Sequence, residues 1–385
     1  MPGRPDIRKS ATRRRRMLFA KLGSFSHTNE RVLEQLHAQF KNYDIETFDV
    51  KDYIKRKFGI TMLNALLEVA MYGPSVLATA SDRHAFFFLT PFMFQHLSTV
   101  IVNEFGPRAA SFDFTLQTQG LFCAALPGRP FFMYTDHTLA SHREYPSYDS
   151  RLFRSKRLLA LEGALYRRAD RIMTTAAHVE RTLVKQYGCD PAHVCTILIG
   201  ANVEASASPD DLARYAAGHI LFVGIDWERK GGPTLLAAFD KVAAEFPHAT
   251  LTIAGCAPPT SHPRVRALGL VPRSDVADLL AKSSIFCLPS LVEPSAVASV
   301  EAMSFKLPVV ATNVGGFPGM VANGETGILV PPGDETALAT ALAELLANPG
   351  RAREMGLAGY QRSRDLFTWD AVGARLHAQI SGQLT

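Results

Sequence analysis

Short apolar runs alternate along the first half of the chain with segments in which apolar residues recur every three or four positions. An apolar run at 17–22 (MLFAKL) precedes a glycine turn and a helical pattern over 32–40. Further runs at 45–50, 111–116 and 131–134 predict three more strands with helical segments between them. This alternation is typical of a parallel sheet with helices on both faces.

The second half repeats the alternation more clearly. Strands are predicted at 219–225 (HILFVGI), 249–254 (ATLTIA), 284–288 (SIFCL) and 308–314 (PVVATNV), with helical patterns interspersed. A small, polar segment at 199–209 separates the two series and is interpreted as a linker. The sequence therefore predicts an α/β protein with two doubly wound domains, whose carboxyl strand ends face a shared ligand across a cleft.

The length fits this division, because 385 residues exceed what one hydrophobic core usually organises. Hydrophobic residues make up 47% and charged residues 20%, as in ordinary globular proteins. We expect a basic flexible tail at 1–16, an N-terminal domain at 17–203 and a C-terminal domain at 204–367. Residues 368–385 are expected to form a helix that returns to the N-terminal domain.

Charge is distributed unevenly. Through Glu204 the chain carries 27 Lys and Arg against 19 Asp and Glu, a balance of +8, and afterwards 14 against 17, a balance of −3. A basic first half suits an anionic partner such as a phospholipid surface, a lipid phosphate or a nucleic acid. The run Arg13–Arg16 lacks interleaved aromatic residues for base stacking, so it is interpreted as part of the solvated tail and no nucleic acid is expected.

The cysteine content indicates the cellular compartment. The chain has five cysteines, namely Cys123, Cys189, Cys195, Cys256 and Cys287. An odd number without a CxxC pair favours reduced thiols and a cytoplasmic protein.

Residues 85–103 (AFFFLTPFMFQHLSTVIVN) lack charges, but Pro91 and polar residues interrupt them. We therefore expect a core helix or a membrane-docking surface rather than a spanning helix. Peripheral contact with the anionic inner face of a membrane stays open.

The stretch 288–303, LPSLVEPSAVASVEAM, carries the most informative pattern. Glu293 follows an apolar strand, a helix begins near Pro294, and Glu301 lies eight positions beyond Glu293, roughly 12 Å along a helix. Such carboxylates are too far apart to couple directly, but they could accept hydroxyl hydrogen bonds at the two ends of an extended ligand. Free N–H groups at the helix start would face an anion between them, at Ser295, Ala296 and Val297. A cap and a surface carboxylate remain an alternative for this pair taken alone.

Other loops at strand ends supply cations and glycines. In VGIDWERKGG, Arg229 and Lys230 precede a glycine turn, where cations can approach phosphate oxygens closely. Gly224, in the same segment, and Gly315 and Gly316, after a later strand, would also admit a ligand close to the backbone, although plain turns explain such glycines equally well. Together these groups match the layout of a nucleotide diphosphate sugar.

From about residue 219 to 376 the chain resembles the donor domain of family-4 glycosyltransferases, retaining enzymes with the GT-B fold. EPSAVASVEAM is similar to the family motif of two glutamates separated by seven residues, and NVGGFPGMVANGETGILVPPGD is similar to its strand, glycine loop and turn series. Upstream, EGALYRRADRIMTTAAHVERTLVKQYGCD and ILIGANVE resemble the approach to the interdomain linker. The resemblance implies two Rossmann-like doubly wound domains that face a central cleft.

The resemblance also implies roles for single residues. Glu293 would contact hydroxyls of the donor sugar and Glu301 the ribose, while Arg229 and Lys230 would neutralise the diphosphate. His137, in YTDHT after a predicted strand, resembles the histidine that approaches the donor sugar in this family. A satisfied polar residue at a strand end is an equal alternative for His137.

Three positions depart from the family pattern. Ala296 stands where many members have glycine, and Ile225 stands where an arginine often follows the strand glycine. Gly319 stands where a glutamate often follows the proline of the glycine loop. The contacts to the diphosphate and the nucleoside base near these positions are left open.

The implied activity is that of a hexosyltransferase that moves a sugar with retention from a nucleotide-sugar donor to an unidentified acceptor, as in polysaccharide or glycoconjugate biosynthesis. The acceptor is expected near the loop that contains Gly23 and Ser24. No metal or cofactor is expected, because HExxH and CxxC motifs are missing from the sequence and His142, His178 and His193 lack ligand spacing. The alternatives are an epimerase, a sugar phosphorylase with a pyridoxal-phosphate lysine, and a non-catalytic protein that binds nucleotide sugars or anionic surfaces.

Overall fold

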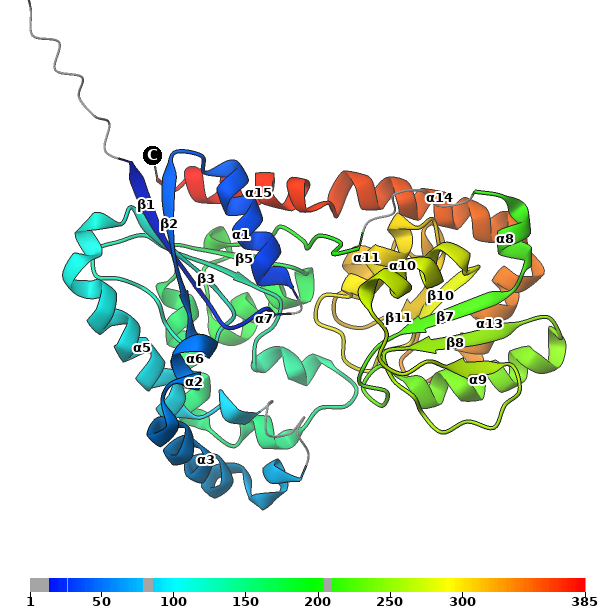
Figure 1. Ribbon diagram of the computed structural model, residues 1–385, viewed down its shortest axis with the longest axis horizontal. Helices are drawn as coiled ribbons and strands as arrows, with labels where there is room; N and C mark the ends of the chain where they lie inside the picture. Colours follow the sequence, from blue (N-terminus) through cyan, green and yellow to red (C-terminus); the bar gives the residue numbers. More distant parts are fainter. Residues whose placement is uncertain (1–13, 26, 79–85, 204–209, 385) are drawn as a thin grey trace, which may run out of the picture.

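The computed structural model describes residues 14–25, 27–78, 86–203 and 210–384, and in this part of the chain it contains two six-stranded parallel sheets. Figure 1 shows the two sheets side by side, each with its own helices. The sheet within residues 15–196 and its helices are called the first lobe, and the sheet within residues 219–330 and its helices the second lobe. The predicted α/β architecture of two doubly wound units is confirmed.

The first lobe has a parallel sheet that is buried on both faces. Its elements are β1 (Arg15–Lys21), α1 (Thr28–Gln39), β2 (Tyr43–Asp49), α2 (Val50–Lys55), α3 (Phe58–Tyr72), α5 (Pro91–Phe105), β3 (Phe114–Thr118), β4 (Phe131–Thr135), α6 (Lys156–Arg168), β5 (Arg171–Thr174), α7 (Ala177–Tyr187) and β6 (Val194–Thr196). The strand order is β2-β1-β3-β4-β5-β6. Residues 17–20 of β1 have no exposed surface, which explains why this strand is an apolar run without alternation.

The second lobe repeats the design. Its elements are α8 (Leu212–Ala216), β7 (His219–Val223), α9 (Gly232–Glu245), β8 (Thr250–Ala254), β9 (Val265–Ala267), α10 (Arg273–Lys282), β10 (Ile285–Leu288), α11 (Val297–Ser304), β11 (Val309–Thr312), α12 (Phe317–Met320), β12 (Gly327–Val330), α13 (Glu335–Ala347) and α14 (Pro349–Leu366). The strand order is β12-β11-β10-β7-β8-β9. In each order a later strand lies on either side of the first one, so the carboxyl edge opens into a crevice.

Four short strands escaped the sequence pattern, namely β5, β6, β9 and β12. Each has three or four residues, so its apolar run does not stand out from the helices that flank it. The strand predicted at 111–116 begins only at Phe114, because residues 106–111 form a 3₁₀ turn. The other predicted strands are present with bounds shifted by a few residues.

The prediction of a flexible tail through residue 16 is wrong for residues 15–16, which begin β1. The Arg16 guanidinium donates to Glu46 of β2 at 2.8 Å, and the Arg16 backbone N–H donates to Asp113 at 2.8 Å. A side chain that looked like a solvated charge is therefore held by a neighbouring strand. The rest of the predicted tail, residues 1–13, lies outside the described residues.

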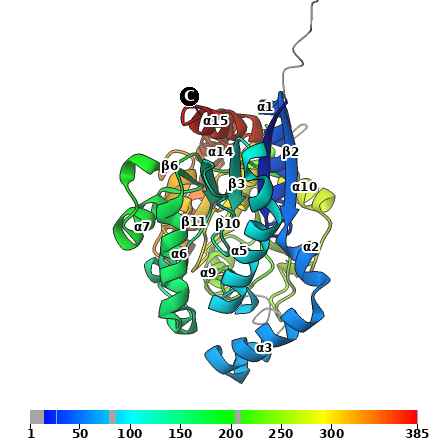
Figure 2. The same ribbon diagram turned by 90° about the vertical axis from the view of Figure 1, so that its left-hand side faces the viewer.

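The end of the chain links the two lobes. Helix α15 (Trp369–Ser381) follows α14 of the second lobe but packs against α1 of the first lobe, as Figures 1 and 2 show. Gln35 donates to Asp370 at 2.9 Å, and Arg171 Nε donates to Gln379 at 2.8 Å. Residues 204–209 of the predicted linker lie outside the described residues, and the proposed domain boundaries stay a prediction.

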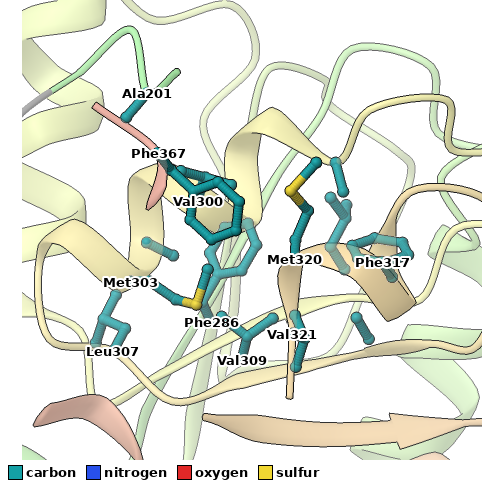
Figure 3. Packing of buried hydrophobic residues seen from close by; sticks show 14 of the residues in the cluster. Ala201, Phe286, Val300, Met303, Leu307, Val309, Phe317, Met320, Val321 and Phe367 are labelled. Atoms are coloured by element: carbon teal, nitrogen blue, oxygen red, sulfur yellow. The ribbon is translucent and has the colours of Figure 1, made fainter. Parts of the chain in front are cut away.

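Helix α11 is fixed from below by an apolar cluster (Figure 3). Val300 and Met303 of α11 are fully buried together with Phe286 of β10, Val309 of β11 and Met320 of α12. Close-packed contacts of this kind allow little rotation of a helix. The start of α11 and the loop before it are therefore held in one orientation.

Most of the apolar stretch at 85–103 lies in the buried helix α5. Met93, Phe94, Leu97 and Ile101 face the core, and Thr90 caps the helix by accepting a hydrogen bond from the Met93 N–H at 3.0 Å. Of the two predicted roles, α5 takes that of a core helix. Among the described helices, none is both long enough and apolar enough to span a membrane.

Candidate active site

A cavity of about 560 Å³ lies between the two lobes, and both contribute to its wall. A larger hollow of about 1050 Å³ is lined by Arg14, Tyr43 and His377 among others. Arg14 and Tyr43 mark the amino edge of the first sheet. Because doubly wound proteins bind ligands at the carboxyl edge, the smaller cavity is the candidate site.

Parallel strands deliver the site residues to one place. His137 follows β4, Glu293 follows β10 and Lys230 lies in the loop after β7. The strands of a parallel sheet end at the same edge, and the two carboxyl edges face each other across the cavity. Residues 63 positions apart, such as Lys230 and Glu293, therefore meet.

Glu293 and Lys230 form a buried ion pair in the cavity wall. Lys230 Nζ donates to Glu293 Oε2 at 2.5 Å, and Ser290 Oγ donates to the same oxygen at 3.0 Å. The two side chains are only 7% and 13% exposed, so little water screens their attraction. Burial by itself would raise the pKa of Glu293, but Lys230 and, beyond it, Arg229 hold that pKa below its usual value.

Arg229 lies beside this pair and is held by the backbone. Its Nη1 donates to the carbonyl of Val292 at 2.9 Å, and its Nε donates to Asp226 at 3.2 Å. A guanidinium has five N–H donors, so these two contacts leave donors for an anion. The cavity wall thus presents two cations next to one carboxylate.

A left-handed residue shapes the start of α11. Ala296 precedes the helix with φ 47° and ψ 34°, a region that residues other than glycine rarely occupy. Ala296 is fully buried, whereas Ser295, Val297 and Ala298 line the cavity. The first N–H groups of a helix lack partners within the helix, so this end offers the cavity a partial positive charge.

His137 presents one unsatisfied nitrogen. Its Nδ1 lies 2.9 Å from Ser141 Oγ, while its Nε2 is buried without a hydrogen-bond partner among the described residues. The ring packs against His142 and Tyr145, with centroids 4.2 and 5.9 Å away. Burial, followed by the neighbouring His142, lowers the pKa of His137 well below its usual value, so the imidazole is neutral at neutral pH. The role of His137 at the donor sugar stays a prediction.

Glu301 occupies another part of the same wall. Its Oε1 accepts a hydrogen bond from the backbone N–H of Asn202 at 3.3 Å, and the residue is 9% exposed. Burial raises the pKa of Glu301 to about 7, although Arg273 at the start of α10 partly opposes this. Both predicted glutamates therefore line one cavity, in different electrostatic surroundings.

Two family models match the chain and decide its membership. Residues 217–348 match the model described as "Glycosyl transferases group 1", and residues 111–205 match the one described as "Glycosyltransferase Family 4". The chain therefore belongs to this glycosyltransferase family. The suspected resemblance is thereby confirmed.

Curated relatives of this chain include several named enzymes. A glycogen synthase of Mycobacterium tuberculosis H37Rv is 30% identical over 239 residues, which cover 59% of this chain and 57% of the relative. A D-inositol 3-phosphate glycosyltransferase of Corynebacterium diphtheriae is 27% identical over 274 residues, which cover 64% of each chain. The chain thus spans about three fifths of the length of the curated relatives it matches.

Solved structures place the chain in the GT-B fold. The sucrose-phosphate synthase of Thermosynechococcus elongatus superposes with a TM-score of 0.67 at 21% identity, covering 96% of this chain and 99% of the other. Anabaena HepE in complex with UDP has a TM-score of 0.66 at 16% identity, covering 95% and 100%. At such identities the likeness concerns the fold.

The predicted glycines support the candidate site from behind its wall. A Cβ on Gly315, whose φ is 54°, would lie 2.0 Å from the Glu293 carbonyl, and the Gly316 N–H donates to that carbonyl at 2.9 Å. Gly224 donates its N–H to Ala254 and packs against Lys230. None of these three glycines is among the residues that line the described cavity. They hold the loops that carry Glu293 and Lys230.

The first-lobe loop also contributes through residues other than those predicted. The Gly23 N–H donates to Asp49 at 2.9 Å, and Ser24 accepts a hydrogen bond from the Asn29 backbone N–H, so both belong to the turn that starts α1. Among the described residues of this loop and of the start of α1, Phe25 and Thr28 line the cavity. The predicted loop therefore borders the cavity, but through side chains other than those of Gly23 and Ser24.

Sequence reasoning missed several polar residues of the cavity, among them Asp136, His142 and Arg273. Burial raises the pKa of Asp136 to about 7 and lowers that of His142 to about 4. Asp136 adjoins His137 in YTDHT and could have been found there. His142 and Arg273 carry no local signal, because only the folded loops bring them to the cavity. Within the described ranges no His, Cys, Asp and Glu side chains form a cluster that could hold a metal ion.

Proposed function

We propose that the protein transfers a sugar, with retention of configuration, from a nucleoside diphosphate sugar to an acceptor hydroxyl. The observation that carries the proposal is the buried pair of Lys230 and Glu293, with Arg229 beside it, next to the start of α11. Cations and amide dipoles suit a diphosphate, and carboxylates accept hydrogen bonds from sugar and ribose hydroxyls. The solved structures of HepE with UDP and with UDP-glucose support this donor class.

The residues act on the charges that develop when the donor breaks. As the bond between the anomeric carbon and the diphosphate oxygen breaks, the sugar becomes positive and the leaving group negative. Arg229, Lys230 and the amides of α11 stabilise the leaving diphosphate. The acceptor oxygen bonds to the anomeric carbon on the same face, and its proton passes to an oxygen of the leaving phosphate.

The Lys230–Glu293 pair prepares the site for a donor. Without ligand, Lys230 keeps the buried Glu293 ionised and able to accept hydrogen bonds from sugar hydroxyls. A bound diphosphate then shares the Lys230 ammonium. The neutral His137 ring would use its unpartnered Nε2 for a hydroxyl of the donor sugar.

Turnover with a panel of nucleotide sugars tests the proposal. Uridine, guanosine and adenosine diphosphate sugars are compared for transfer, hydrolysis and thermal stabilisation. The Glu293→Ala variant should lower kcat/KM by about a hundredfold or more while remaining folded, whereas Glu335→Ala at an exposed ion pair should not. Stabilisation without turnover would favour the non-catalytic binding protein, and unchanged activity of Glu293→Ala would contradict the assignment.

The proposed reaction uses neither metal nor cofactor, because Arg229 and Lys230 supply the positive charge. Turnover should therefore persist in EDTA. Loss of activity that Mg²⁺ restores would contradict this part of the proposal.

We also propose a cytoplasmic setting with peripheral contact to an anionic membrane. The excess of Lys and Arg in the first half and the absence of disulfides among the described cysteines support this setting.

We further propose that the acceptor enters from the first lobe, past Phe25 and Thr28, which line the cavity on that side.

A further inference from the structure

Helix α3 turns one row of large apolar side chains toward solvent. Phe58, Met62 and Leu66 recur every fourth residue and are 78%, 52% and 68% exposed, and Leu63 beside them is 44% exposed. Residues four apart share one face of a helix, so these side chains form a continuous stripe. The stripe comprising these four residues is called the apolar face of α3.

The opposite face of α3 is polar and fixed to the protein. Asn64, Glu68 and Tyr72 are buried at the same four-residue spacing. The Asn64 amide donates to the carbonyl of Phe87 at 2.7 Å, and the Tyr72 hydroxyl donates to the carbonyl of Leu89. Rotation of α3 to bury its apolar face would break these hydrogen bonds, so the exposure of that face is built into the fold.

Basic side chains adjoin one end of the apolar face. Lys51, Lys55, Arg56 and Lys57 are exposed in and after α2, and Asp52 is the single acid between them. From residue 58 through 81 the sequence contains one charged residue, the inward-facing Glu68. An apolar stripe with a cationic end matches a lipid layer whose headgroups are anionic.

The chain reaches α3 from the carboxyl edge of the first sheet. α3 follows β2 and α2, so it projects from the carboxyl edge of the first sheet, the edge that carries His137. Figures 1 and 2 show α3 protruding at the end of the first lobe.

We propose that α3 and residues 51–57 form a docking surface for an anionic lipid membrane. The apolar face enters the boundary between headgroups and acyl chains, and the basic residues pair with lipid phosphates. A stable contact between protein chains uses roughly 20–30 residues a side, far more than this stripe offers, whereas a membrane needs only a short helix face. The proposal is independent of the proposed transfer reaction, because binding to vesicles requires no turnover.

Sedimentation with vesicles tests the surface. The wild type should bind vesicles of phosphatidylcholine mixed with phosphatidylglycerol, and it should bind vesicles of pure phosphatidylcholine only weakly. Added salt should reduce this preference for anionic vesicles. The double variant Phe58→Ser, Leu66→Ser should bind at least about tenfold more weakly, since each side chain loses its apolar contact. Charge reversal at Lys55 or Lys57 (K55E or K57E) should weaken binding to the anionic vesicles about fivefold for each residue.

Matched variants separate docking from general surface effects. Leu270→Ser and Leu212→Ser remove equally exposed leucines from the second lobe and should leave vesicle binding unchanged. Circular dichroism and thermal unfolding check that all variants fold. Donor hydrolysis by the double variant should match the wild type in the absence of vesicles, which distinguishes loss of docking from loss of the site.

The depth of insertion gives a second readout. In the Met62→Trp variant the new indole should be quenched by lipids brominated near the headgroup end of the acyl chain, while the two native tryptophans, Trp227 and Trp369, should not. Failure of the wild type to bind anionic vesicles, or equal binding by the double variant, would overturn the proposal. A wild-type dimer that the double variant loses in analytical ultracentrifugation would assign the apolar face to a second copy instead.

Discussion

At the residue scale, the site depends on how burial and charge act on each carboxyl group. Lys230 keeps Glu293 ionised, whereas Glu301 lacks so close a cation and its pKa rises to about 7. The sequence showed two similar glutamates eight positions apart. Their different states follow from partners that lie far away along the chain.

The Glu301→Gln substitution should remove a pH-dependent loss of stability. The pKa of Glu301 rises from 4.5 to about 7 on folding, so between these values the folded protein keeps a proton that the unfolded chain releases. The free energy of unfolding therefore falls as pH rises through this window, by up to about 3 kcal/mol. Urea unfolding across the window should show the variant gaining stability relative to the wild type.

Glu344→Gln, at an exposed ion pair with Arg351, serves as the control and should change stability little. A difference between wild type and Glu301→Gln that stays constant across the window would show that Glu301 does not titrate as inferred.

Ala296 shows how a departure from the family pattern can keep the local geometry. The residue has the left-handed backbone that glycine adopts most easily. Its small side chain lies in the core beneath the cavity wall, so the turn before α11 is made without glycine. The sequence identified the position as unusual, but only the structure shows that the turn persists.

At the element scale, loops behind the cavity position the residues in front of it. The glycine loop after β11 was predicted to meet the ligand, yet Gly315 and Gly316 contact the backbone of Glu293 and Pro294. A turn glycine and a ligand-binding glycine look alike in a sequence. The two cases differ in whether the glycine Cα faces another backbone segment or the ligand cavity, which only the folded structure shows.

Gly315→Ala should destabilise the protein by more than the strain of its positive φ alone. A Cβ there would overlap the Glu293 carbonyl, so the variant should lose stability and displace Glu293, lowering kcat/KM. Gly324→Ala is the matched control, because Gly324 has φ 81° and open space around its Cβ. We expect a cost of about 1–2 kcal/mol for Gly324→Ala and clearly more for Gly315→Ala, measured by urea unfolding. Equal costs with unchanged turnover would refute the supporting role.

Helix α3 shows the limit of hydrophobic patterning. Its apolar and polar positions both recur at helical spacing, so the helix itself is readable from the sequence. The usual rule would turn Phe58, Met62 and Leu66 inward. Hydrogen bonds from Asn64 and Tyr72 to residues 87–89 decide the opposite orientation.

At the scale of the whole molecule, α15 connects the lobes that share the cavity. Leu376, in the middle of α15, is 2% exposed and belongs to the core. The Leu376→Ala variant should lower the free energy of unfolding by about 2–5 kcal/mol, because it leaves a cavity in that core. Urea unfolding measures the loss, and kcat/KM at low temperature should remain close to the wild type.

Gln383→Ala, exposed just beyond α15, is the control and should be neutral. If Leu376→Ala is equally neutral, α15 does not hold the lobes together as its packing indicates.

The sequence by itself determined the two α/β units and singled out Glu293, Glu301, Arg229 and Lys230, because apolar periodicity and charged groups after apolar runs are local properties. Tertiary structure alone decided that Lys230 pairs with Glu293, that Asp136, His142 and Arg273 join the cavity and that α3 faces outward. Each of these depends on burial and on contacts between residues far apart in the chain. Local pattern does not encode such contacts, so they appear only when the sheets and helices are packed.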